Sequence, residues 1–110
     1  MYCKLRNDDV VRHFVYRLED ARNHGRTLTY EDKKLFSYST CIAQWVGGNI
    51  VLNDTQYSAT TSRIMRYVRQ HIAHRYDSSE YGTVRSDDVI KAITGVPQNT
   101  QDLISYLSKE

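Results

Sequence analysis

The first helical signal lies near the start of the chain, where apolar residues recur three and four positions apart: Val10, Val11, Phe14, Val15 and Leu18. This spacing places them on one face of an α-helix. Asn7 or Asp8 can cap its start, and Gly25 suits the left-handed residue that ends a helix. The pattern therefore predicts a helix over residues 8 to 24, followed by a charged connection over residues 26 to 34.

The hydrophobic period then changes to two. Between residues 36 and 46 bulky side chains alternate with small ones, the bulky set being Phe36, Tyr38, Thr40, Ile42 and Val46. Such alternation predicts a β-strand with one bulky face. Gly47-Gly48 can supply the positive φ angles of a hairpin turn, so residues 49 to 53 are the expected returning strand. A further turn and a short third strand at Tyr57-Ser58 complete a small antiparallel meander.

A central amphipathic helix is expected over about residues 62 to 75. It buries Ile64, Val68 and Ile72, and an arginine face lies on its opposite side. A polar linker follows, and then two short C-terminal helices are expected as a helical hairpin over residues 86 to 108.

The predicted fold class is therefore α+β. It consists of an N-terminal helix, a small antiparallel β-hairpin or meander sheet, the central amphipathic helix and the two short C-terminal helices. A length of 110 residues indicates a single domain over residues 1–110, with a core module at about residues 35–76.

Composition places this pattern among ordinary folded proteins. The chain is 40% hydrophobic and 25% charged, which supports one hydrophobic core and argues against general disorder. No apolar run approaches the roughly 20 residues of a membrane span, and the first residues lack the apolar stretch of a secretory signal. We expect a cytosolic domain without membrane contact.

Cysteine and histidine content changes this picture little. Cys3 and Cys41 are too few for a disulfide framework or a cysteine-based zinc site, so reduced thiols are expected and a bridge between them is the alternative. His71 and His74 could hold a metal with Asp77, but no His-Glu-x-x-His pattern frames them, so neither metal nor cofactor is expected. The sequence also lacks a glycine-rich phosphate loop and a nucleophile elbow. We therefore expect no catalytic residues and no enzymatic activity.

The strongest candidate for a binding site is the junction between the sheet and the central helix. Hydroxyl side chains gather there beside arginines, and both can bind a phosphate or carboxylate near the positive end of a helix dipole. Helix capping by one hydroxyl, with the arginines facing water, is the alternative explanation. The candidate partner-binding or anion-binding residues are Tyr57, Ser58, Thr60, Thr61, Ser62, Arg63, Arg66, Arg69 and Gln70.

The arginine face also suits nucleic acid. Arginines can contact phosphates while Tyr67 and Tyr76 stack on bases, and Arg75 extends the same set. Residues 1–76 hold 12 of the 15 Lys and Arg residues, but the net charge of the whole chain is only +2. A pI near 8.6 is also below the value of about 9 that is typical of dedicated nucleic-acid binders. The C-terminal helices have the spacing of a helix-turn-helix but few cations, which favours a plain hairpin.

The central stretch resembles a module found in small bacteriophage and prophage proteins. The resemblance covers about residues 35 to 70, and its most specific parts are the Ser-Tyr-x-Thr-x-Ile-Ala run at residues 37–43 and the Tyr-Ser-x-Thr-Thr-Ser run at residues 57–62. It implies a phage accessory protein in the bacterial host cytoplasm, where such non-enzymatic proteins often block defence systems such as CRISPR effectors. It carries no catalytic residues.

Two functions follow as expectations. The first is a phage-type accessory protein that inhibits a bacterial defence protein or nuclease complex through protein–protein contacts, in the manner of an anti-CRISPR. The alternative is a nucleic-acid-binding regulatory protein that uses the arginine face of the central helix. The edge strands of so small a sheet can also pair across a two-fold axis, which leaves a homodimer open.

Overall fold

The computed structural model describes residues 3–77 and 84–107 of the chain. Within these ranges, four helices and seven strands follow one another in the order β1 (Cys3–Leu5), α1 (Asn7–Val15), β2 (Ala21–Asn23), β3 (Leu28–Glu31), β4 (Lys34–Ser37), β5 (Thr40–Val46), β6 (Asn49–Asn53), α2 (Ala59–Tyr76), α3 (Ser86–Val89), β7 (Ile90–Ile93) and α4 (Ile104–Leu107). None of the described helices is long and apolar enough to cross a membrane.

All seven strands form one sheet, and their order in the sheet is their order in the chain. β2 to β6 pair antiparallel through tight turns, as the predicted meander requires. At the two edges, β1 pairs parallel with β2 and β7 pairs parallel with β6. Parallel neighbours need a crossover connection, and α1 and α2 supply one at each edge. The α+β class is confirmed, and the sheet is mixed rather than purely antiparallel.

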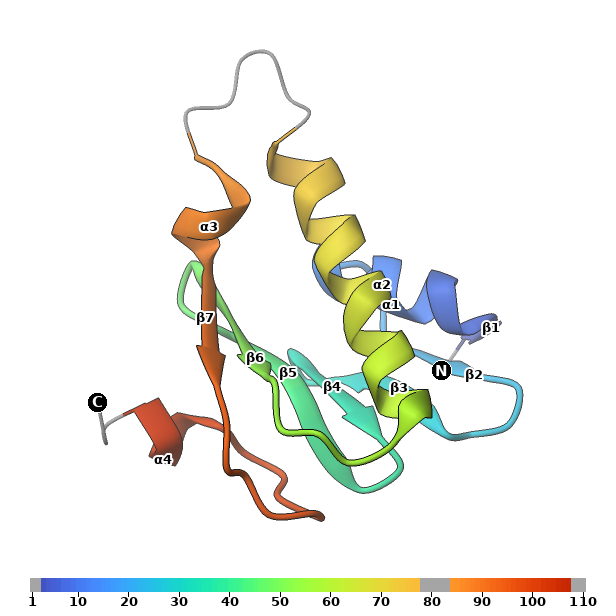
Figure 1. Ribbon diagram of the computed structural model, residues 1–110. Helices are drawn as coiled ribbons and strands as arrows, with labels where there is room; N and C mark the ends of the chain where they lie inside the picture. The colour runs from blue at the N-terminus through green and yellow to red at the C-terminus, as the bar shows by residue number, and fades with distance from the viewer. Residues whose placement is uncertain (1–2, 78–83, 108–110) are drawn as a thin grey trace.

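Both long helices cover the same face of the sheet and pack on one another (Figure 1). The core between helices and sheet includes Phe14, Ile42 and Ile72, each fully or almost fully buried. The buried residues of this core run from Val10 to Val89. Residues 35–76, the expected core module, therefore share their core with residues before and after them. The prediction that Ile64, Val68 and Ile72 form the buried stripe of the central helix is confirmed.

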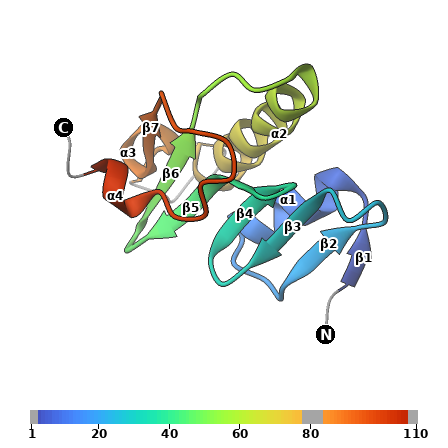
Figure 2. The same ribbon diagram turned by 90° about the horizontal axis from the view of Figure 1, so that it is seen from below.

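The chain after β7 covers the other face of the sheet. It returns past β6 and β5 in Figure 2 and forms a second, smaller apolar cluster around Cys41, Val51 and Leu103. Backbone and side-chain hydrogen bonds hold it there, because the Leu103 N–H donates to Gln44 Oε1 at 2.9 Å and the Cys41 N–H donates to the Thr100 carbonyl at 2.7 Å. Residues that were expected to form a helix therefore act mainly as a cover.

The first predicted helix is only half as long as expected. α1 ends at Val15, and residues 21–23 form β2 instead. The helix stops because Arg17 adopts a left-handed backbone (φ 54°) that brings its guanidinium to the Gly47 carbonyl. The expected caps are also wrong. Arg6 occupies the N-cap position without a side-chain bond, and Gly25 lies in the connection between β2 and β3.

The predicted charged connection and long strand are rearranged into hairpins. Residues 28–31 and 34–37 form β3 and β4, joined by a turn in which Asp32 and Lys33 both have positive φ. A second turn with Tyr38 at φ 56° then splits the expected strand over residues 36–46 into β4 and β5. The Gly47-Gly48 turn and its returning strand are confirmed as the β5–β6 hairpin.

The C-terminal half differs from prediction in three places. The central helix begins at Ala59, so the expected strand at Tyr57-Ser58 is absent and Ser58 is the N-cap residue. The first expected C-terminal helix ends at Val89, and residues 90–93 form β7, which gains parallel backbone pairing with β6. The last helix contains only residues 104–107. The helical hairpin over residues 86–108 is therefore wrong; residue 108 and most of the predicted polar linker lie outside the described residues.

Candidate functional site

The hydroxyl cluster at the start of α2 divides into capping and exposed members. The Ser58 Oγ accepts a hydrogen bond from the Thr61 N–H at 3.2 Å and contacts the Thr61 hydroxyl at the same distance. Thr61 is only 7% exposed, whereas Thr60 and Ser62 face solvent. The capping explanation therefore accounts for Ser58 and Thr61, and it leaves the other two hydroxyls free to meet a ligand.

Tyr57 serves the interior of the protein. Its hydroxyl donates to the Val96 carbonyl and accepts a 3.0 Å hydrogen bond from Asn53 Nδ2. Asn53 is fully buried in β6 and also donates to the Cys41 carbonyl at 3.1 Å. Tyr57 therefore fastens the C-terminal cover to the sheet.

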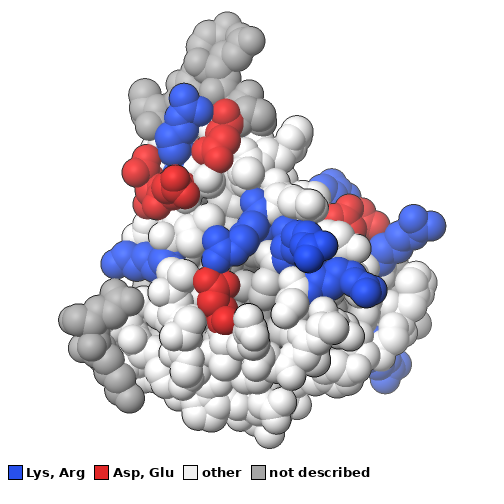
Figure 3. Space-filling model, in the orientation of Figure 1, with Lys and Arg blue, Asp and Glu red and all other residues white. Residues whose placement is uncertain are grey.

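The exposed face of α2 carries positive charge without acidic neighbours on the same helix. Over residues 59–76 the sequence has four arginines and no Asp or Glu. At 100° per residue, Arg63, Arg66 and Gln70 fall on one side, opposite the buried stripe, and all three are exposed. Figure 3 shows the Lys and Arg side chains gathered over the region that α2 crosses in Figure 1. We call Arg63, Arg66 and Gln70 the basic face.

The arginines of α2 differ in their partners. Arg69 forms a 2.6 Å ion pair with Asp54 at the end of β6. Arg75 points inward, donates to the Val15 carbonyl and lies over the rings of Tyr16 and Tyr76. Among the residues that the structure describes, Arg63 and Arg66 form no ion pair. These two are therefore the arginines available to an external anion.

Two grooves flank the first turns of α2. The first, which we call the Arg66 groove, has a volume of about 430 Å³ and is lined by Asp54, Thr55, Gln56, Thr61, Ser62, Met65, Arg66 and Arg69. The second, the Arg63 groove, has a volume of about 470 Å³ and is lined by Leu5, Arg6, Asn7, Asp8, Asn23, His24, Gly25, Arg63 and Tyr67. The basic face therefore forms a ridge with a concave surface on either side.

The remaining members of the predicted nucleic-acid set lie elsewhere. Tyr67 and Tyr76 are partly buried and pack against the main core, so their rings are not free stacking platforms. Arg75 is held between aromatic rings and a backbone carbonyl, as described above. The surface that can meet an anion is therefore smaller than the sequence predicted.

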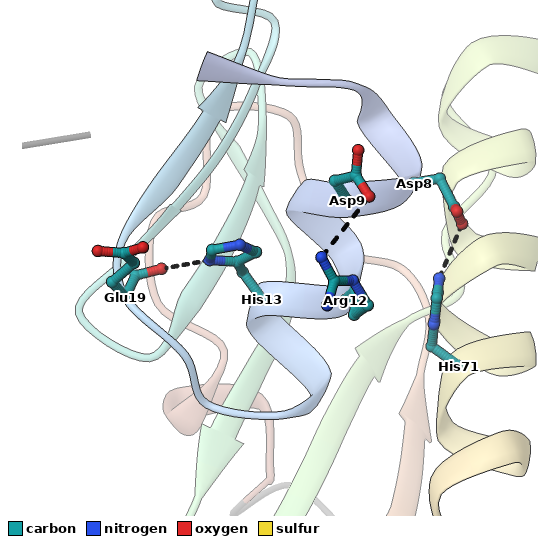
Figure 4. A network of polar contacts seen from close by, with 6 residues as sticks. All are labelled: Asp8, Asp9, Arg12, His13, Glu19 and His71. Atoms are coloured by element: carbon teal, nitrogen blue, oxygen red, sulfur yellow. Dashed lines mark hydrogen bonds and ion pairs between the residues drawn. The ribbon is translucent and has the colours of Figure 1, made fainter. Parts of the chain in front are cut away.

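The two histidines of α2 do not form a metal centre in the structure. His71 Nε2 lies 2.7 Å from Asp8 Oδ1 and joins α2 to α1 (Figure 4). Asp77, the expected third ligand, instead accepts hydrogen bonds from the Ser86 hydroxyl at 2.6 Å and the Ser86 N–H at 2.7 Å. No group of three or more metal-ligating side chains occurs within the described ranges.

Cys41 is a buried, free thiol in β5. Burial raises its pKa to about 12, and hydrogen bonding to the Ala43 carbonyl only partly opposes this effect. A thiol with so high a pKa is almost entirely protonated at neutral pH and is a poor nucleophile. The side chain therefore fills space in the second, smaller apolar cluster.

Two features near the candidate site were not predicted from the sequence. Asp54, which follows β6, pairs with Arg69 fifteen positions away, and no sequence signal indicates this contact. Tyr38 was assigned to the bulky face of a strand, but it lies in a turn and is 71% exposed. Strand alternation continues through this position, so the sequence offered no clear signal for a turn there.

Comparison with known proteins places the chain in a family but not in a functional class. Residues 15–88, about two thirds of the chain, match the model of a family of unknown function, DUF8033, and the chain belongs to that family. The matched region contains β2 to α2, the first three residues of α3 and every candidate binding residue. Neither the curated proteins nor the solved structures provide a significant match.

Proposed function

We propose that the protein is a non-catalytic binding protein that docks its basic face against an acidic surface of a protein partner. The observation that carries this proposal is the pair of exposed arginines, Arg63 and Arg66, on a helix that has no acidic residue to neutralise them. Carboxylates on a partner could supply the missing counter-charges, because a carboxylate accepts two parallel hydrogen bonds from a guanidinium.

The charge count supports a protein partner over a long polyanion. Proteins that bind duplex DNA strongly through phosphates make on the order of six to ten such contacts. Here Arg69 is already paired with Asp54, and Asp8 lies beside His71 at one border of the face. Two unpaired arginines fit a local acidic patch, and Arg is enriched among the residues that dominate protein interfaces.

The resemblance of residues 35–70 to phage proteins suggests the partner class. We take the partner to be a bacterial defence protein or nuclease complex, met in the host cytoplasm and blocked by occlusion, as an anti-CRISPR acts. The basic face would then cover an acidic patch on that complex, while the rest of the domain hinders access to its substrate.

An interference assay tests this proposal. The chain is expressed in bacteria that carry one defence system from a panel, and the plating efficiency of a targeted phage is measured. We expect protection of the phage in one system and loss of that protection in the double variant Arg63→Glu/Arg66→Glu, because two attractive contacts become repulsive. Lys33→Glu/Lys91→Glu is the matched control, with the same change in net charge, since both lysines are exposed and line neither groove beside the basic face. Inhibition in no system, or equal inhibition by the double variant, contradicts the proposal.

Nucleic-acid binding is the second candidate function, favoured by the absence of any acidic residue in α2. Nucleic-acid binding is recognised by an affinity that falls steeply with added salt, because each phosphate contact releases counterions. Fluorescence anisotropy with labelled duplex DNA and RNA across a salt series measures this slope. Undetectable binding at low salt removes this candidate and leaves the protein partner.

A further inference from the structure

Tyr38 stands out as an exposed aromatic residue in a strained backbone position. It occupies the two-residue turn between β4 and β5 with φ 56°, a conformation that favours glycine or asparagine over a bulky side chain. Its N–H donates to the Thr27 carbonyl at 2.7 Å, which fixes the turn, yet the residue is 71% exposed. Folding alone would be served as well by glycine here. The other described non-glycine residues with positive φ are all polar or charged, so Tyr38 differs from them in placing an exposed aromatic ring at a turn. An exposed ring without a packing role points to a role in binding.

A neutral cavity opens on one side of Tyr38. This cavity, which we call the Tyr38 groove, has a volume of about 280 Å³ and is lined by Ser37, Tyr38, Thr40, Ile42, Tyr57, Ser58, Thr61, Gln98 and Asn99. It contains hydroxyl and amide groups, the two aromatic rings of Tyr38 and Tyr57, and no charged side chain. That composition suits a planar, polar and uncharged group, which can stack on the ring and form hydrogen bonds with the walls. The concave surface on the other side of Tyr38 includes Glu31, which disfavours an anionic ligand there.

The Tyr38 groove adjoins the Arg66 groove. Thr61 lines both, so the two cavities lie on either side of one side chain. The first is neutral and aromatic, whereas the second carries the unpaired Arg66. A ligand that spans both must combine a flat polar ring with a negative charge.

We propose that these adjoining grooves bind a nucleotide unit, with the base stacked on Tyr38 and the phosphate at Arg66. Nucleobases have both a π-face and polar edges, and aromatic stacking beside a cationic groove is how proteins hold unpaired bases. Small-ligand sites generally occupy about 300–1,000 Å³, and each groove is near the lower end of that range. The unit can be a free mononucleotide or one residue of a single strand; the chemistry of the contact is the same.

This inference goes beyond the protein-binding proposal, because Tyr38 and the neutral groove lie outside the basic face, although Arg66 belongs to both surfaces. Tyr38→Gly separates the two, since it removes the proposed base stack and leaves Arg63 and Arg66 in place. A protein that binds no nucleotide can still protect the phage, and one that protects no phage can still bind a nucleotide, so the two proposals fail separately.

Binding to the full chain is measured by titration, with isothermal calorimetry and amide NMR shifts as the two readouts. The probes are AMP, adenosine, inorganic phosphate and short single-stranded RNA and DNA oligomers, all at low salt. We expect AMP or an oligomer to bind and to shift the amides of Tyr38 and Thr61. Tighter binding of an oligomer than of AMP identifies a strand as the source, and the reverse order identifies a free nucleotide.

Two variants separate the parts of the site. Tyr38→Gly is expected to weaken binding about tenfold, in line with the loss of one base stack, without lowering the thermal midpoint of unfolding. Tyr38→Phe keeps the ring and should bind as the parent does. Arg66→Gln should weaken the binding of AMP but not of adenosine, whereas Arg12→Gln, of equal net charge, should change neither.

Three results would overturn the inference. The first is no binding of any nucleotide or oligomer at low salt. The second is binding that Tyr38→Gly leaves unchanged. The third is inorganic phosphate that binds as well as AMP, which would mean a simple anion site at the arginine without a place for the base.

Discussion

The indole Nε1 of Trp45 donates a 2.7 Å hydrogen bond to the backbone carbonyl of Phe14. This bond ties the middle of the sheet to the last turn of α1. On the solvent side, the guanidinium of Arg17 lies 3.8 Å from the centroid of the Trp45 ring and donates to the Gly47 carbonyl. Trp45 is 5% exposed, so one side chain joins a strand, a helix end and a hairpin turn.

Trp45→Phe should therefore destabilise the fold. The variant keeps an aromatic ring but leaves the Phe14 carbonyl without its side-chain donor and weakens the contact with Arg17. We expect a loss of about 2 kcal/mol in the free energy of unfolding, from the unsatisfied buried acceptor and the reduced cation–π attraction. Urea unfolding followed by circular dichroism measures it. Arg17→Gln removes the stacked charge and the exposed hydrogen bond to the Gly47 carbonyl but keeps the indole bond. It should cost less than half as much, and an equal cost for the two variants would refute the assignment to the indole bond.

Asn53→Ala tests the buried amide that fastens the C-terminal cover. Asn53 is fully buried, and its removal leaves the Cys41 carbonyl and the Thr55 N–H without their side-chain partner. Unsatisfied buried groups cost about 1–3 kcal/mol each, so we expect a loss of about 3 kcal/mol in the free energy of unfolding. Differential scanning calorimetry gives the change. Asn49→Ala, at the half-buried start of the same strand, is the control and should stay within about 0.5 kcal/mol of the parent.

The contrast between Asn49 and Asn53 shows what the sequence could and could not predict. Alternation and the Gly47-Gly48 turn were enough to place the β5–β6 hairpin, because both signals are local. The role of Asn53 depends on Tyr57 and on a carbonyl of the neighbouring strand, and no local pattern encodes these contacts. The helical periodicity around Leu18 was misleading, because tertiary contacts of Arg17 override local propensity.

Asp77 should make stability depend on acid pH. Hydrogen bonds from the Ser86 hydroxyl, and next from its N–H, lower the pKa of this carboxyl below its usual value of 3.8 in the folded state. The folded protein therefore binds this proton less readily than the unfolded chain does. Its stabilising effect is fully present above the unfolded pKa and is lost as the pH falls through the folded pKa.

Removal of the Ser86 hydroxyl should weaken that dependence. The free energy of unfolding of Ser86→Ala is expected to fall less steeply than that of the parent between about pH 5 and pH 2. Urea titrations at a series of pH values measure both slopes, and Asp77→Asn provides the limit in which the group does not titrate. Parallel curves for the parent and Ser86→Ala would show that the hydroxyl does not set the pKa.

Cys41 should be inert in the native protein. With its pKa raised to about 12 by burial, only about one thiol in ten thousand is ionised at pH 8. In a Cys3→Ser background, iodoacetamide should leave Cys41 unmodified under native conditions and label it fully in urea, as read by mass spectrometry. Rapid labelling of the folded protein would mean that the second, smaller apolar cluster opens readily.

Prediction of the binding surface was limited in the same way as prediction of the fold. The periodicity of α2 placed Arg63, Arg66 and Gln70 together correctly, since residues three and four apart share a helix face. It also placed Arg69 among the available charges, because nothing in the sequence shows that Asp54 lies beside it. Tyr38 was missed because strand alternation runs through its position, and only the backbone geometry marks it as a turn.

The order of strands in the sheet has a consequence for biosynthesis. Each strand from β1 to β7 lies next to the one made just before it. A chain that leaves the ribosome from its N-terminus therefore meets a completed neighbour at every step, and no strand has to insert between two that are already paired. β6 has to wait longest for its next neighbour. The edge that will pair with β7 stays unpaired until the 18 residues of α2, and then β7, have been synthesised. During that interval β6 is the edge most in need of protection from a neighbouring nascent chain.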